Sequence, residues 1–111
     1  MLYGYGYRRV WNCSFYIGDN SITPTNLQGV TSITRKSGNS IIIYTCTLPQ
    51  ALTYDYTIMA QFIENTAEPT TQSNDFAVLL AKPINRQTFS IGVERTNPGN
   101  TVSLAIALIE K

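Results

Sequence analysis

Apolar and polar residues alternate along most of this chain, and this period of two is the feature that most limits its fold. Within residues 56–62, 89–93 and 102–108 every second residue is apolar. Successive side chains of a strand point to opposite faces, so each segment would turn one apolar face to a core. The chain also holds 12 Ile, 5 Val and 14 Thr, which favour strands over helices. The sequence therefore predicts an all-β protein.

Turn residues divide the chain into seven or eight expected strands. We expect them at residues 3–17, 30–35, 40–48, 54–63, 76–81, 88–94 and 101–109, the first being one long strand or two short ones. The second and third would form a hairpin in which Gly38 has a positive φ. Residues 18–29 and 64–75 are expected to be loops. Short antiparallel strands without a helix predict a two-sheet β-sandwich that occupies residues 1–111 as one domain.

Composition excludes several classes of function. The chain has 8 basic and 7 acidic residues, so its net charge is +1 and it lacks the basic surface that binds nucleic acid or anionic membrane. Its apolar runs are much shorter than the roughly 18 residues of a membrane span. It has no His, which is the usual general base near neutral pH and the commonest metal ligand. We expect no nucleic-acid partner, no membrane insertion, no metal and no cofactor.

Enzymatic activity is not expected either. A glycosidase needs only two carboxylates on either side of the scissile bond, so acidic residues alone could supply a catalytic pair. None of the seven lies in a recognisable motif: Asp19, Asp55, Glu64, Glu68, Asp75, Glu94 and Glu110. The sequence also has no phosphate-binding glycine loop and no nucleophile elbow. We interpret the carboxylates as solvated surface groups.

The two cysteines, Cys13 and Cys46, allow two interpretations. A disulfide between them would close a loop of about 33 residues and stabilise the fold by on the order of 3 to 4 kcal/mol in an oxidising compartment. Each cysteine, however, lies in an apolar strand pattern, and the first nine residues lack the basic and apolar stretches of a signal peptide. We favour two small core thiols in a chain made in a reducing cytosol.

Some strands are apolar on both faces, which predicts contact with other copies of the chain. Residues 41–44 and 76–81 are continuous apolar runs, and the second face of the last strand carries small groups at Ser103, Ala105 and Ala107. Only 14% of the residues are charged. We expect an obligate symmetric interface. The alternative is that both faces are buried within the monomer.

Several short motifs occur in a recognisable order. Residues 30–35 read Val-Thr-Ser-Ile-Thr-Arg and precede a glycine turn and an aliphatic strand. Residues 48–51 read Leu-Pro-Gln-Ala and lead to Tyr54. Residues 88–91 read Thr-Phe-Ser-Ile, and the last strand follows. This order, from residue 29 to residue 109, resembles the C-terminal head or knob domains of bacteriophage tail fibres.

The resemblance implies a homotrimeric β-sandwich at the distal end of a virion tail fibre, made in the host cytoplasm. In this interpretation residues 1–17 form an aromatic strand region that continues from a shaft. Exposed loops would bind a host cell-surface glycan or outer-membrane protein without chemistry. Two alternatives stay open: a structural assembly domain of a virion or baseplate, and a monomeric carbohydrate-binding module.

Receptor contacts are expected in the loops at residues 64–75, 82–87 and 95–100. Amides and a guanidinium can bind hydroxyls and carboxylates, and an aromatic ring can stack on a sugar. The candidate residues are Tyr54, Asn65, Gln72, Asn74, Asn85, Arg86, Asn97 and Asn100. Ordinary turn chemistry would explain most of the asparagines equally well. We interpret the aromatic residues Tyr3, Tyr5 and Tyr7 as core or subunit interface.

Overall fold

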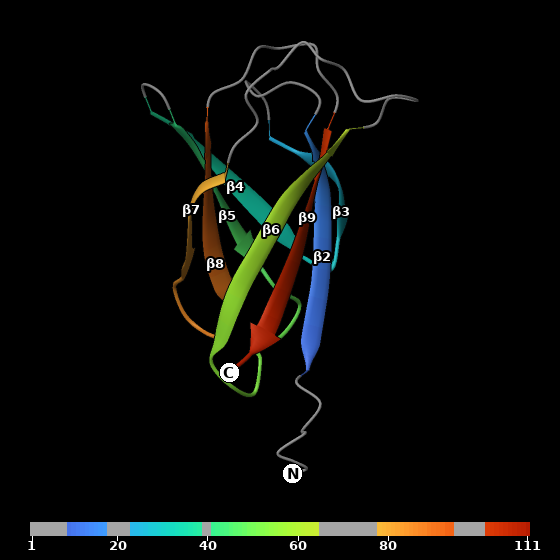
Figure 1. Cartoon of the computed structure of the whole chain (residues 1–111), viewed down its shortest axis with the longest axis vertical. Helices are drawn as coiled ribbons and strands as arrows, with labels where there is room; N and C mark the ends of the chain where they lie inside the picture. Colours follow the sequence, from blue (N-terminus) through green and yellow to red (C-terminus); the bar gives the residue numbers. More distant parts are fainter. Residues whose placement is uncertain (1–8, 18–22, 39–40, 65–77, 95–101) are drawn as a thin grey trace.

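The protein is a β-sandwich of two antiparallel sheets, as the alternation predicts (Figure 1). The computed structural model describes residues 9–17, 23–38, 41–64, 78–94 and 102–111. These residues contain eight strands and no helix. They include no helix with the length and hydropathy that a bilayer crossing requires. Tyr3, Tyr5 and Tyr7 lie outside the described residues.

Each sheet has four strands. The first has the order β3-β2-β9-β6 and consists of β2 (Val10–Ile17), β3 (Thr25–Gln28), β6 (Tyr56–Glu64) and β9 (Val102–Glu110). The second has the order β4-β5-β8-β7 and consists of β4 (Ser32–Ser37), β5 (Ile41–Thr47), β7 (Val78–Pro83) and β8 (Thr88–Glu94). The first sheet thus pairs strands from the two ends of the chain.

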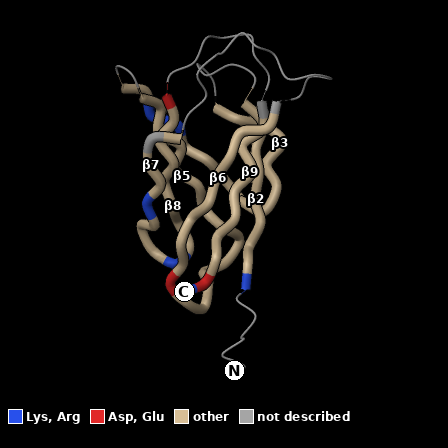
Figure 2. Tube along the Cα trace, viewed as in Figure 1, with Lys and Arg blue, Asp and Glu red and all other residues tan. Residues whose placement is uncertain are grey.

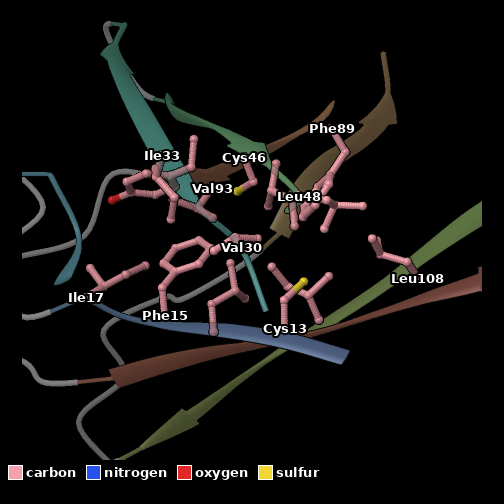
Figure 3. Close-up of a cluster of buried hydrophobic side chains, with 14 of the residues drawn as sticks. Cys13, Phe15, Ile17, Val30, Ile33, Cys46, Leu48, Phe89, Val93 and Leu108 are labelled. Atoms are coloured by element: carbon pink, nitrogen blue, oxygen red, sulfur yellow. The ribbon is translucent and has the colours of Figure 1, made fainter. Parts of the chain in front are cut away.

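The core lies between the sheets and is built from the inward residues of each alternating strand. Phe15, Leu104 and Phe89 are at most 1% exposed, and Figure 3 shows inward side chains of the two sheets pointing toward one another. The rings of Phe15 and Tyr44 meet across the core with centroids 5.5 Å apart. Burial raises the pKa of Tyr44 above its ordinary value, and the nearby charge of Arg35 offsets only part of this rise. Burying such side chains supplies roughly 1.5 to 3 kcal/mol each.

Both cysteines are free thiols in this core, as predicted; the reducing compartment of the same interpretation stays a prediction. Cys13 is 4% exposed and Cys46 is 0% exposed. Burial raises the pKa of each thiol to about 12. Because the thiolate is the reactive form, neither should be nucleophilic in the folded protein.

We therefore expect no reaction of either thiol with a disulfide reagent under native conditions at about pH 8. In denaturing guanidinium the same reagent should label two thiols per chain, the full cysteine content. Absorbance of the released thiolate measures both. Rapid labelling of the native protein, or labelling that requires prior reduction, would contradict the buried free thiols.

Three sequence predictions about the strands are wrong in detail. Residues 25–28, expected to be loop, form β3, which pairs with β2 across an irregular register at which Asn26 has a φ of 55°. Gly38 does not have a positive φ; its N–H donates to Ile41 O at 2.8 Å. β4 runs through residues 36–37 and β7 through residues 82–83, both expected to be turns. At these positions hydrogen bonding to a neighbouring strand outweighs the local preference of the residues for a turn.

The second face of β5 and β7 is covered partly by the chain itself. On the outer face of the second sheet, Gly92 lies between Ile41 and Leu80. A Cβ built on Gly92 would stand 2.7 Å from Ile41 Cδ1 and 2.8 Å from Leu80 Cγ. The missing side chain makes room for both aliphatic groups, so part of the two-sided apolar character needs no second copy. Leu80 is still 42% exposed.

Candidate functional site

The strand ends that flank the three expected contact loops lie at two different ends of the sandwich. Arg9 and Lys111 mark one end, which we call the terminal end: Glu110 N–H donates to Arg9 O, and Lys111 N–H donates to Asp55 O. The loop between β7 and β8, with Asn85 and Arg86, lies at this end (Figure 1). The strand ends that flank residues 65–77 and 95–101 lie at the opposite end. Five expected residues lie outside the described ranges: Asn65, Gln72, Asn74, Asn97 and Asn100.

Two loops join at the terminal end into one surface, the loop platform, made of residues 48–55 and 84–87. Their backbones are bonded directly, since Leu52 N–H donates to Arg86 O at 2.7 Å and Leu48 N–H donates to Gln87 O at 2.8 Å. The Gln87 side chain adds a third bond, from Nε2 to Leu48 O at 3.0 Å. The two loops therefore hold each other in place.

The Arg86 side chain also ties the two loops together. Its Nε donates to Asp55 Oδ1 at 3.2 Å, and its Nη1 donates to Thr53 O at 3.0 Å. Both charged side chains are largely exposed, at 53% and 73%. An exposed ion pair of this kind adds at most about 1 kcal/mol. The guanidinium that was expected to contact a receptor thus helps to position the loop, and part of the Arg86 side chain is still open to solvent.

Asn85 has the turn role that was the alternative interpretation. Its Oδ1 accepts hydrogen bonds from the backbone N–H groups of Gln87 and Thr88, both at 2.8 Å. The Tyr56 hydroxyl lies 2.8 Å from Asn85 O and 3.1 Å from Thr88 O. Burial raises the pKa of Tyr56 to about 12, with smaller contributions from Cys13 and Cys46. The tyrosine thus anchors the platform to the core in its neutral form.

Tyr54 projects from this fixed surface. It is 53% exposed, and Ile84 in the facing loop is 53% exposed as well. A tyrosine offers a flat apolar ring with a polar tip, which suits stacking on a sugar or packing on a protein. Among the described residues, no group of three potential metal ligands gathers here or elsewhere. The platform thus exposes an aromatic ring and an aliphatic side chain on two loops that hold each other in place.

A hollow of about 370 Å³ adjoins the platform. Its lining includes Trp11, Gln50 and Thr53, with Arg9 and Glu110. Trp11 Nε1 donates to Gly29 O at 2.8 Å, which fixes the indole in one orientation. An aromatic ring, an amide, a hydroxyl and two charged groups lie within reach of one small ligand. The terminal end thus combines a projecting tyrosine with a polar hollow.

A larger hollow lies on the outer side of the first sheet. Its volume is about 670 Å³, and its floor includes Ala105 and Ala107 of β9. Met59 and Gln61 of β6 border it on one side, and Asn12 of β2 borders it on the other. We call the outward side of this sheet the neutral face, because none of its described outward side chains is charged. Figure 2 shows no charged residue along the middle of β2, β9 or β6.

Sequence reasoning named Tyr54, Asn85 and Arg86 as candidates but did not predict that they lie at one end of the sandwich, and it missed their partners. Asp55 was interpreted as a solvated carboxylate, and Thr53 and Ile84 were not singled out. A sequence signal for the pairing of Arg86 with Asp55 is absent, because the two loops are 31 positions apart. The exposed Ile84, directly after a Lys-Pro pair, was a usable signal, since an apolar residue in a turn has no core to face.

Comparison of this chain with models of protein families, with curated proteins and with solved structures finds no match.

Proposed function

We propose that this protein is a non-catalytic receptor-binding head of the phage tail-fibre kind, and that its loop platform contacts a glycan or protein on a host cell surface. The observation that carries the proposal is the exposed ring of Tyr54 on two loops that are bonded to each other. The resemblance of the sequence to tail-fibre heads supports a binding role. It does not support a shaft that enters through residues 1–17, because β2 begins at the terminal end and such a shaft would lie beside the platform.

A fixed platform favours binding because little conformational entropy remains to be lost on contact. Each immobilised side chain or loop residue otherwise costs about 0.5 to 1.5 kcal/mol on association. Tyr54 supplies apolar area, and the outer edge of the Arg86–Asp55 pair supplies polar contacts around it. The hollow beside Trp11 would take a neighbouring unit of an extended ligand. Several copies on one fibre would raise the overall affinity through avidity.

We expect Tyr54→Ala to weaken binding roughly 30-fold, as loss of about 2 kcal/mol at an aromatic contact implies. Tyr54→Phe should retain most of the binding, because it keeps the ring. Fluorescently labelled protein is titrated onto a panel of bacterial cells and onto an array of bacterial surface glycans.

Lys36→Ala is the control, since Lys36 is exposed on the outer face of the second sheet. If the wild type binds none of the cells and none of the glycans, the proposal is wrong. It is also wrong if wild type and Tyr54→Ala are retained equally. In that second case binding belongs to another surface, and the loops beyond residues 64 and 94 are the next to be substituted.

A structural assembly domain is the second candidate function, and the neutral face is the observation that favours it. Such a domain would form stable complexes with virion proteins and would show no affinity for cells or glycans in the same titration. A monomeric carbohydrate-binding module would bind a glycan while its mass stays at the 12.4 kDa of one chain.

A further inference from the structure

We propose that the neutral face is where copies of this chain bind one another, with the side chain of Met59 from one copy seated over Ala105 and Ala107 of the next. The inference does not depend on what the loop platform binds. It rests on the charge, relief and area of this face.

The two outer faces of the sandwich differ in charge. On the second sheet, Lys36, Lys82 and Glu94 point outward, as expected of a surface in water. On the first sheet the outward residues are all uncharged: Val10, Asn12, Ser14, Tyr16, Gln28, Thr57, Met59, Gln61, Ile63, Ser103, Ala105, Ala107 and Ile109. Depletion of charge at the centre is what distinguishes protein interfaces from other surface.

The neutral face also has a ridge beside a trough. The strand register sets Met59 opposite Ala107, and Gln61 opposite Ala105. On the far side of β9, Ala105 faces Ser14. Small side chains along β9 therefore form the floor of the 670 Å³ hollow, while the larger side chains of β6 stand beside it. Met59 is 62% exposed and Ile63 is 46% exposed, so the ridge carries two large apolar side chains on one face of β6.

Ridge and trough on one face make the face complementary to itself. A twofold axis would place Met59 of each copy over the alanine floor of the other. Three copies around a threefold axis would place each ridge against the next trough. Methionine is unbranched and flexible, so it fills such a gap in either arrangement.

The area fits an interface between copies. With about 3.3 Å per residue and 4.8 Å per strand, the strands of this sheet, which have 8, 4, 9 and 9 residues, cover roughly 500 Å² in plan. The relief of the side chains brings the accessible area toward the roughly 600 Å² per partner at which stable interfaces begin. A charged partner would bury charges that this face cannot pair, whereas another copy brings none.

The test is the mass in solution, measured by light scattering after size exclusion at micromolar concentrations. Wild type should have the mass of two or three chains, a multiple of 12.4 kDa. Met59→Lys and Ala105→Arg place a charge on the ridge and in the trough, and both should give single chains. Ile84→Lys is the matched control, since Ile84 is 53% exposed but lies in the loop platform, and it should keep the wild-type mass.

Wild type at 12.4 kDa at every concentration would overturn the proposal, as would an oligomer that both face variants retain. Far-UV circular dichroism checks that each variant is folded. If Ala105→Arg fails to fold, Met59→Lys carries the test, because its side chain is already mostly in solvent. Either failure concerns the face alone and leaves the cell and glycan titration of Tyr54→Ala to judge the receptor proposal.

A second measurement needs no variant. Dilute hydrogen peroxide oxidises the Met59 thioether to the sulfoxide, with peroxide reduced to water. If copies cover the ridge, oxidation at Met59 should slow several-fold as the protein concentration rises, with added free methionine as the reference for the reagent. Peptide mass spectrometry follows it. Oxidation of Met59 as fast as that of the free methionine at every protein concentration would overturn the proposal.

Discussion

Replacement of Gly29 by alanine should lower the free energy of unfolding by about 3 kcal/mol. Gly29 has a φ of 77°, a conformation that costs an L-residue roughly 1 to 2 kcal/mol. A Cβ at this position would also collide with Asn12 O and stand 2.9 Å from Cys13 Cβ. Overpacking of this kind typically adds about 1 to 3 kcal/mol. The carbonyl of Gly29 also accepts the Trp11 hydrogen bond, which any shift would strain.

Urea denaturation monitored by the fluorescence of Trp11, the one tryptophan of the chain, measures the loss. Gly92→Ala is the matched control. A Cβ there meets side chains rather than backbone, and Leu80, at 42% exposure, can turn toward solvent. Gly92 is buried, so some overpacking remains, and we expect a cost of about 1 kcal/mol, at the low end of the range for overpacking. Equal costs at both glycines would show that the left-handed conformation and the backbone contact at Gly29 are not the cause.

The second large effect should come from alkaline pH. Burial raises the pKa of Cys13 and Cys46 from 9.0 to about 12 and that of Tyr56 from 10.0 to about 12. The folded state holds these protons more tightly than the unfolded state does. Stability should therefore be complete below about pH 9 and should fall as pH rises toward 12.

The slope of this fall is predictable for the thiols. Each can cost at most about 1.4 kcal/mol per pH unit, so two together approach about 3 kcal/mol per unit. The net stability of a small domain is about 5 to 15 kcal/mol, so a loss on this scale should remove a large part of it before pH 12. Circular dichroism in a pH titration with a reductant present follows the transition.

A variant with Cys13→Ala and Cys46→Ala separates the thiols from the tyrosines. It is less stable at neutral pH because small cavities are created, but its stability should change less steeply above pH 9. The informative quantity is the slope of the unfolding free energy against pH. If the slope equals that of the wild type, the thiols do not titrate as the burial of both side chains implies.

Several features of the fold could be predicted because strand geometry is local. The alternation in residues 56–62 identified Tyr56, Ile58, Ala60 and Phe62 as one face, and the structure turns that face to the core. The same holds for Phe89 and Ile91. A period of two follows from covalent geometry and needs no knowledge of neighbouring strands.

Partners across the sheets could not be predicted in this way. β2 lies beside β9 although nearly the whole chain separates them, and β3 was taken for a loop because its four residues carry weak strand signals. The candidate site could likewise be predicted only in part. Tyr54 and Arg86 were found by residue type, while the pairing of Arg86 with Asp55 depends on how two distant loops meet.

The sequence by itself determined that the chain is all-β and which side of most strands is apolar, because side-chain alternation is a property of each strand alone. Only the tertiary structure decided that Ala105 has Gln61 and Ser14 beside it, that the uncharged residues gather on one outer face, and that Gly29 lies against the backbone of β2. Those relations arise only when both sheets pack together. Packing then selects one set of strand pairings among several that fit the local pattern equally well.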